Sequence, residues 1–155
     1  MSIGRLMRDL RAPTFAMQVR EKDLDWSETK APTLEEFERI AQTAFSELPD
    51  HFRARCADVI LRVQDFPDAD VMREMELESP FDILGLYHGV AETHRSVLEV
   101  SHLPDMVFLY RRPMLDYWTE YDETLGDIIR HVLVHEIGHH LGFSDDDMHA
   151  IERGA

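Results

Sequence analysis

The sequence predicts a single α+β domain, in which helices pack on one small sheet of mixed or antiparallel strands. Three features of the sequence predict this class: an amphipathic helix in the first third, three short strand-like segments in the middle, and a long helix near the end. The length of 155 residues suits one domain, and a hydrophobic content of 44% is enough to form a core. Residues 1–30 show no sustained periodicity, so we expect a flexible or partly helical N-terminal extension there and the folded domain over residues 31–155.

The first helix is expected directly after Pro32. Thr33 and Glu36 have the T-x-x-E spacing of a capping box, in which each side chain binds the backbone N–H of the other residue. The helix is expected to end before Pro49. Apolar residues at helical spacing mark its buried face: Phe37, Ile40, Ala41, Ala44, Phe45 and Leu48.

Three segments have the character of strands. Residues 58–64 alternate, with Val59, Leu61 and Val63 on the buried face. Residues 83–88 form the second strand, where Gly85 indicates a bulge or a close backbone approach. Residues 106–111 form the third, with Pro113 expected to stop it. The acidic segment 70–78 is expected to be a short helix or loop, and residues 89–105 a loop.

The longest helix is expected from Asp122 or Thr124 to about Leu141. Gly142 stands just beyond, where a left-handed C-cap residue belongs. Ser144 is expected to cap a final short helix that ends near Arg153. The apolar residues of these two helices are Leu125, Ile128, Ile129, Val132, Leu133, Met148 and Ile151.

The net charge of −15 argues against a nucleic-acid binder and against docking on anionic lipid, because both surfaces attract basic proteins. No apolar run approaches the length of about 18 to 20 residues that a membrane span needs, and no secretory signal is recognisable. Cys56 is the only cysteine, so an internal disulfide is impossible. A reducing compartment, the cytoplasm, is therefore expected.

The long helix contains an H-E-x-x-H motif at residues 135–139. His135 and His139 lie one turn apart on the same face, so both imidazoles can bind one zinc ion. Glu136 is rotated by about 100° around the helix, which places its carboxylate beside the metal and within reach of a metal-bound water. The arrangement is typical of metal-dependent hydrolases, in which the carboxylate takes a proton from that water.

A catalytic zinc ion usually has three protein ligands. The sequence continues to Gly142 and Asp145, which gives the longer pattern H-E-x-x-H-x-x-G-x-x-D. A reversal at Gly142 can return Asp145 to the metal as the third ligand; the alternative is that Asp145 only favours the start of the last helix. Chance gives the short motif in about 5% of such chains and the longer one in about 4 of 10,000, so the longer pattern carries the prediction. The fallback ligands are Asp146, Asp147 and His149.

Other candidates are weaker. His131 lies four residues before His135 and can extend the site, although a hydrogen-bonded or solvent-facing histidine is the more common interpretation. His140 is expected to pack or to line the cleft, and Cys56 to be buried. Four strand residues could stabilise an oxyanion, although aromatic residues in strands are more often core: Tyr87, His88, Tyr110 and Arg111.

The C-terminal half resembles the minimal zincin-like metallopeptidase family of bacteria. The matching segments are F-D-I-L-G-L-Y-H-G at 81–89, L-P-D at 103–105, V-F-L-Y-R at 107–111 and V-H-E-I-G-H-H-L-G at 134–142. The first helix and first strand also fit, so the resemblance covers about residues 33–152. It implies a zincin-like α+β fold over the domain 31–155, with zinc on His135 and His139, Glu136 as the catalytic carboxylate and Asp145 at the third-ligand position.

The predicted function is zinc-dependent hydrolysis of a peptide or protein substrate, with one zinc ion and Glu136 as general base. An extended peptide is expected to align along an exposed strand edge, at residues 83–88 or 106–111. The alternative is a non-catalytic zinc-binding module with a regulatory or interaction role, indicated by the short stretch after Asp145. Zinc suits two histidines and a carboxylate, with iron and manganese as alternatives.

Overall fold

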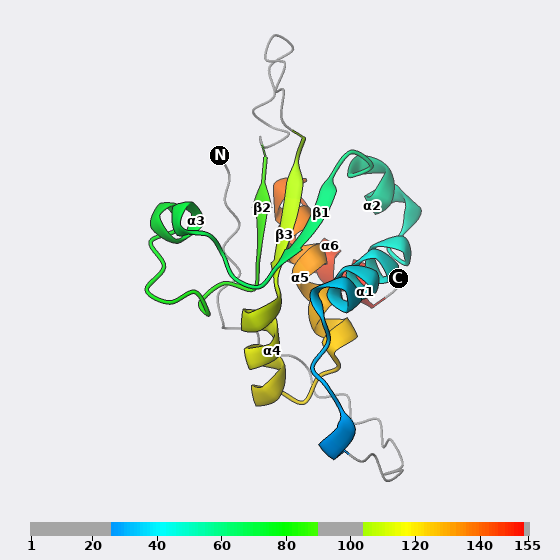
Figure 1. The fold of residues 1–155 in the computed structure, drawn as a ribbon. Helices are drawn as coiled ribbons and strands as arrows, with labels where there is room; N and C mark the ends of the chain where they lie inside the picture. The colour runs from blue at the N-terminus through cyan, green and yellow to red at the C-terminus, as the bar shows by residue number, and fades with distance from the viewer. Residues whose placement is uncertain (1–25, 90–103, 154–155) are drawn as a thin grey trace.

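A three-stranded mixed sheet with the order β1-β3-β2 lies at the centre of the fold (Figure 1). The structure is a computed structural model that describes residues 26–89 and 104–153. The central strand β3 (Met106–Tyr110) pairs in parallel with β1 (Ile60–Gln64) and antiparallel with β2 (Gly85–His88). The predicted α+β class is therefore confirmed, with a mixed sheet. Because β3 is paired on both sides, the hypothesis that a peptide aligns along residues 106–111 is wrong. Among the strands that the structure describes, β2 is the candidate that remains at a sheet edge.

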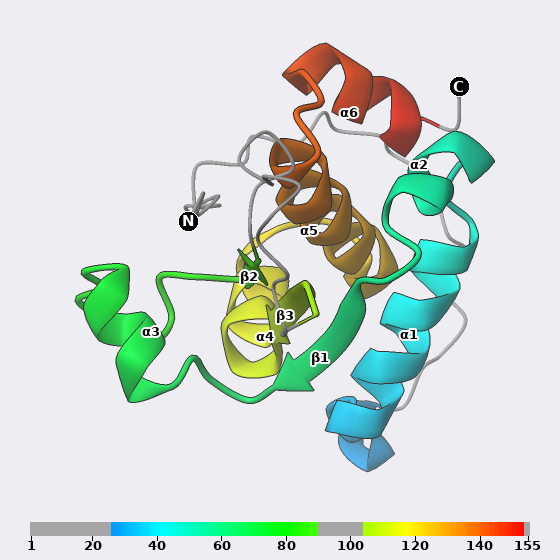
Figure 2. The same ribbon diagram turned by 90° about the horizontal axis from the view of Figure 1, so that it is seen from above.

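Side chains that alternate along the strands divide the core between the two faces of the sheet. Val107 and Leu109 join the larger cluster, which α1 (Leu34–Ser46) and α5 (Leu125–His140) cover. Phe108 and Tyr110 join a smaller cluster beside α3 (Ala69–Glu74) on the opposite face. Viewed from above, α1 and α5 lie on one side of the sheet and α3 lies apart from them (Figure 2).

The predicted helix caps are present. Thr33 and Glu36 form the reciprocal capping box of α1, with Glu36 N donating to Thr33 Oγ1 at 3.2 Å and Thr33 N donating to Glu36 Oε2 at 2.7 Å. Thr124 caps α5 by accepting from Asp127 N. These contacts satisfy backbone donors that a helix start leaves without intrahelical partners.

Two helices were not expected from the sequence. The short α2 (Asp50–Arg55) follows Pro49, and α4 (Arg111–Glu120) begins where β3 ends. Pro113 therefore does not stop the strand; it lies in the first turn of α4, where a missing N–H costs no helical hydrogen bond. The buried face of α4 includes Met114 and Tyr117, which are three residues apart.

The acidic segment after β1 forms α3, which Asp68 caps by accepting from Val71 N at 2.9 Å. A single-turn 3₁₀ helix, η1 (Trp26–Glu28), precedes α1. The predicted extension 1–30 falls mostly outside the described residues, as does most of the predicted loop 89–105. Among the described helices, none has the length and apolar character required to cross a bilayer.

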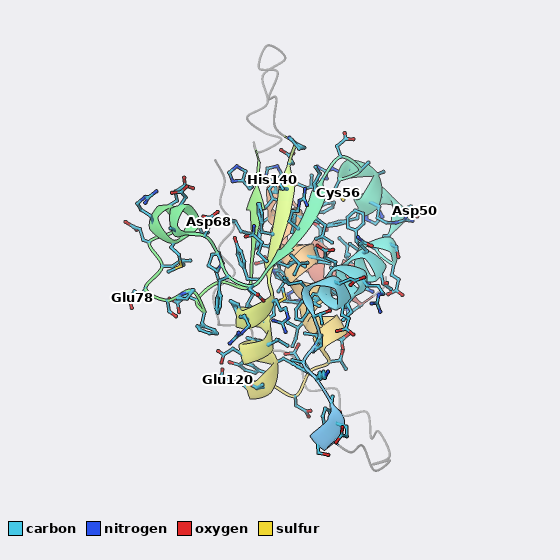
Figure 3. The ribbon with its side chains drawn as sticks, viewed as in Figure 1. Asp50, Cys56, Asp68, Glu78, Glu120 and His140 are labelled. Atoms are coloured by element: carbon cyan, nitrogen blue, oxygen red, sulfur yellow. The ribbon has the colours of Figure 1, made fainter. Side chains whose placement is uncertain are left out.

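Cys56 is buried at the end of α2, as predicted (Figure 3). Its Sγ lies 3.1 Å from the backbone oxygen of Phe52, to which it donates. Burial raises the pKa of the thiol to about 11, and this effect outweighs the opposite influence of Arg53 and Arg55.

We expect this pKa to suppress the reaction of Cys56 with a disulfide reagent. Because the thiolate is the reactive form, the folded protein should react at pH 8 about 100-fold more slowly than an exposed thiol. Thiol titration with and without guanidinium measures the effect, with one thiol per chain released on unfolding. Fast reaction of the folded protein would contradict the burial of Cys56.

Candidate metal centre

Three histidines lie one turn apart along α5 and share one face of the helix. The ring centroids of His131 and His135 are 4.1 Å apart, and those of His135 and His139 are 5.7 Å apart. His135 is 7% exposed, whereas His139 is exposed at the end of the helix. The structure therefore brings together the two histidines of the motif. His131, His135 and His139 form a line along the helix, called the histidine row below.

His135 has the protonation state that a metal ligand needs. Burial lowers its pKa to about 4, and the neighbouring His131 adds to this effect while the carboxylate of Glu152 opposes it. The imidazole is therefore neutral at pH 7, which is the form that binds metals. Its Nε2 is buried and makes no hydrogen bond within the described part of the chain.

Glu136 is 1% exposed and contacts β2. Its Oε2 accepts a hydrogen bond from the backbone N–H of Tyr87 at 3.2 Å. Tyr110 N donates to Leu84 O just before β2 begins. Because hydrogen-bonded pairs alternate along an antiparallel ladder, Leu86 and His88 are the residues of β2 that bond to β3. The N–H of Tyr87 consequently points away from β3, and Glu136 satisfies it at the free side of the strand.

The end of α5 is a Schellman motif. Phe143 N donates to Gly138 O at 2.9 Å and Gly142 N donates to His139 O at 3.2 Å. Gly142 has the left-handed φ of 78° that this turn requires. The reversal leads into α6 (Asp145–Glu152), whose Met148 packs so closely on Gly138 that a Cβ there would lie 2.5 Å from Met148 Sδ.

The acidic residues at the start of α6 are exposed. Asp147 completes a capping box with Ser144, which accepts from Asp147 N at 3.2 Å, and its hydrogen bonds to Ser144 lower the pKa of its carboxyl group. Asp145 is the first residue of the helix and does not join a group of metal-ligating atoms among the described residues. Of the fallback ligands, His149 has its ring centroid 6.3 Å from that of His135.

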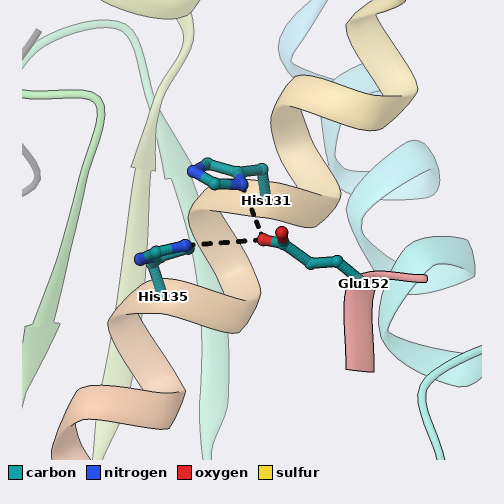
Figure 4. A group of neighbouring side chains, drawn as sticks. All are labelled: His131, His135 and Glu152. Carbon is teal, nitrogen blue, oxygen red and sulfur yellow. Dashed lines mark ion pairs between the residues drawn. The ribbon is translucent and has the colours of Figure 1, made fainter. Parts of the chain in front are cut away.

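The structure instead brings Glu152 to the histidine row (Figure 4). Its Oε1 lies 2.6 Å from His131 Nδ1 and 3.6 Å from His135 Nε2. Sequence reasoning missed this residue because it lies beyond the motif. The available signal was that Glu152 follows His149 by three residues, so both belong to one face of α6.

The remaining candidate residues are packed, buried, paired or exposed at positions outside the histidine row. His140 stacks on Tyr87 at 3.6 Å between ring centroids, so it packs against β2 as expected (Figure 3). Tyr110 is buried, and burial together with Asp68 and Glu136 raises the pKa of its hydroxyl. Arg111 donates to the backbone oxygen of Pro32 and pairs with Asp65, whereas His88 is exposed.

These residues fit a zinc ion. A neutral buried imidazole with no hydrogen bond at Nε2, a second imidazole one turn further on and nearby carboxylates are the donors that zinc prefers. A buried polar atom without a partner costs free energy, which a bound cation would recover.

Comparison with known proteins supports this interpretation. The model of the zincin-like metallopeptidase family matches residues 56–155. The match begins after α1, later than the resemblance suggested, and includes the whole sheet and the histidine row. The search of curated proteins found no match. The matched region is well over half of the chain and carries H-E-x-x-H on its longest helix, so the chain belongs to the zincin-like metallopeptidase family.

Proposed function

We propose that this protein is a zinc-dependent peptidase that uses Glu136 as its general base. The observation that carries the proposal is the buried Nε2 of His135, which is neutral at pH 7 and forms no hydrogen bond with any described residue. His135 and His139 hold the ion, and Asp145 is the third ligand that the sequence motif supports. When bound, zinc supplies Lewis acidity that lowers the pKa of water and polarises a carbonyl group.

Glu136 would accept a proton from the attacking water. The hydrogen bond from Tyr87 N to Oε2 fixes the orientation of its carboxylate, and the buried surroundings strengthen the electrostatic influence of a nearby cation on it. A base held in this way loses little entropy when the reaction begins. Tyr87 is thus a positioning residue that acts through its backbone.

The substrate would be an extended peptide of a protein or oligopeptide, aligned with β2. This strand lies at the edge of the sheet and contacts α5 directly. An edge strand can recognise a peptide by main-chain pairing with an added strand. On β2 this pairing would use outward-facing groups other than the N–H of Tyr87, which donates to Glu136. A peptide cannot align along residues 106–111 in the same way, because β3 is the central strand and both of its edges are paired.

A non-catalytic zinc-binding module is the competing function. It is favoured by the burial of Glu136, since a carboxylate that bonds the backbone of β2 also has a purely structural use. Both functions require the metal, so they differ only in whether Glu136 takes part in hydrolysis.

Zinc titration of the metal-free protein tests the site. We expect one equivalent to bind, with His135→Ala weakening the affinity at least about 100-fold and His51→Ala, an exposed histidine on α2, leaving it unchanged. Asp145→Asn should weaken binding by about 10-fold or more, and Asp58→Asn, which changes an exposed carboxylate before β1, is its matched control. A wild-type protein that takes up no zinc would overturn the proposal.

A further inference from the structure

The group formed by His131, His135 and Glu152 has the composition of a metal site in its own right (Figure 4). One donor atom from each residue lies within 4.8 Å of the others. Two of the residues come from α5 and the third from α6, and the hydrogen bond from Arg130 Nη2 to Ile151 O at 3.1 Å holds α6 against α5 beside the group. Two imidazoles and one carboxylate are a ligand set that zinc takes in proteins.

The buried atoms of this group lack the hydrogen bonds that would explain them as structure alone. Nε2 of His135 and Oε1 of Glu152 are buried without a hydrogen bond inside residues 26–89 and 104–153, and His131 faces them with its Nδ1. Oε1 of Glu152 forms an ion-pair contact of 2.6 Å with His131 Nδ1 that does not have hydrogen-bond geometry, and it lies 3.6 Å from His135 Nε2, beyond hydrogen-bond distance. A carboxylate and two imidazoles that converge in this way favour a cation between them.

We propose that His131, His135 and Glu152 form a second, alternative position for a divalent metal ion, one helical turn before the position set by His135 and His139. The two positions share His135. A single Nε2 lone pair binds one ion, so the positions cannot both be filled in one molecule. The existence of the second position stands on its own contacts, whereas its consequence rests on the proposed function: an ion held there keeps His135 out of the catalytic ligand set.

Zinc binding to variants that remove one position at a time tests this proposal. His139 is exposed, so His139→Ala leaves no cavity and removes only the first position. We expect His139→Ala to bind one equivalent of zinc, with an affinity that falls at least about 10-fold further in His139→Ala/Glu152→Gln and in His139→Ala/His131→Ala. His139→Ala/Glu38→Gln, which changes an exposed carboxylate on α1, should bind as His139→Ala does.

Cobalt(II) absorption gives a second readout, since the number and type of ligands determine the spectrum independently of any catalytic activity. Circular dichroism of each metal-free variant checks that it folds. The proposal is overturned if His139→Ala binds no zinc, or if Glu152→Gln and His131→Ala leave its binding unchanged. Failure of the proposed function has a different result: the wild type and His139→Ala would then bind zinc equally well, with the second position alone in use.

Discussion

Glu136→Gln is expected to lower kcat for peptide hydrolysis by about 10²- to 10⁴-fold, the usual contribution of a general base. Glutamine has the same shape and keeps an oxygen that can accept from Tyr87 N, but it cannot take a proton from water at neutral pH. Because Glu136 is proposed to lie beside the ion and not on it, the zinc affinity should change by no more than about threefold.

A panel of fluorogenic peptides, assayed with zinc-loaded protein, measures this effect. Glu74→Gln changes an exposed carboxylate at the end of α3 and serves as the matched control, with unchanged kcat. Zinc content is measured on the same samples, so that loss of metal is not mistaken for loss of the base. Equal hydrolysis by the Glu136→Gln variant and the wild type would refute the role of Glu136 and favour the non-catalytic module.

Local sequence signals predicted those parts of the fold that depend on local chemistry. Thr33 and Ser144 each begin a helix as expected, and Thr124 is the later of the two starts expected for α5. A side-chain oxygen three residues before a backbone donor satisfies that donor without tertiary help. The start of α4 was missed because a proline normally ends regular structure, and its tolerance within a first turn depends on where the turn begins. The order of the three strands was not predictable either, since it is set by contacts across the sheet.

The candidate site also has one part that the sequence predicted from local spacing and one part that depends on tertiary packing. The spacing of His135, Glu136 and His139 along one helix determines their relative directions, so the motif alone located them. Glu152 is different, because it reaches His135 only through the reversal at Gly142 and the packing of α6 on Gly138. Spacing along the chain says nothing of how closely two helices approach, which depends on the side chains between them.

The last prediction concerns Gly85, where β2 packs tightly on α5. A Cβ at this position would lie 2.6 Å from Val132 Cγ1 and 3.1 Å from the backbone oxygen of Phe108. The close approach expected from the sequence is therefore confirmed. Val132 is fully buried and β-branched, so its side chain has few other rotamers to adopt in a helix.

Gly85→Ala should consequently lower the free energy of unfolding by about 1–3 kcal/mol, the usual cost of overpacking a core. The matched control is Gly126→Ala at the start of α5, where the nearest atom to a Cβ is Thr124 Oγ1 at 3.9 Å; alanine there should stabilise by about 0.4–1 kcal/mol. Chemical denaturation measures both, and equal stability of the two variants would contradict the close contact.

Gly85 lies two residues before Tyr87, so separating β2 from α5 should also lengthen the hydrogen bond from Tyr87 N to Glu136. A loss of kcat in the Gly85→Ala variant, with zinc affinity retained, would then show that the contact between β2 and α5 orients the base.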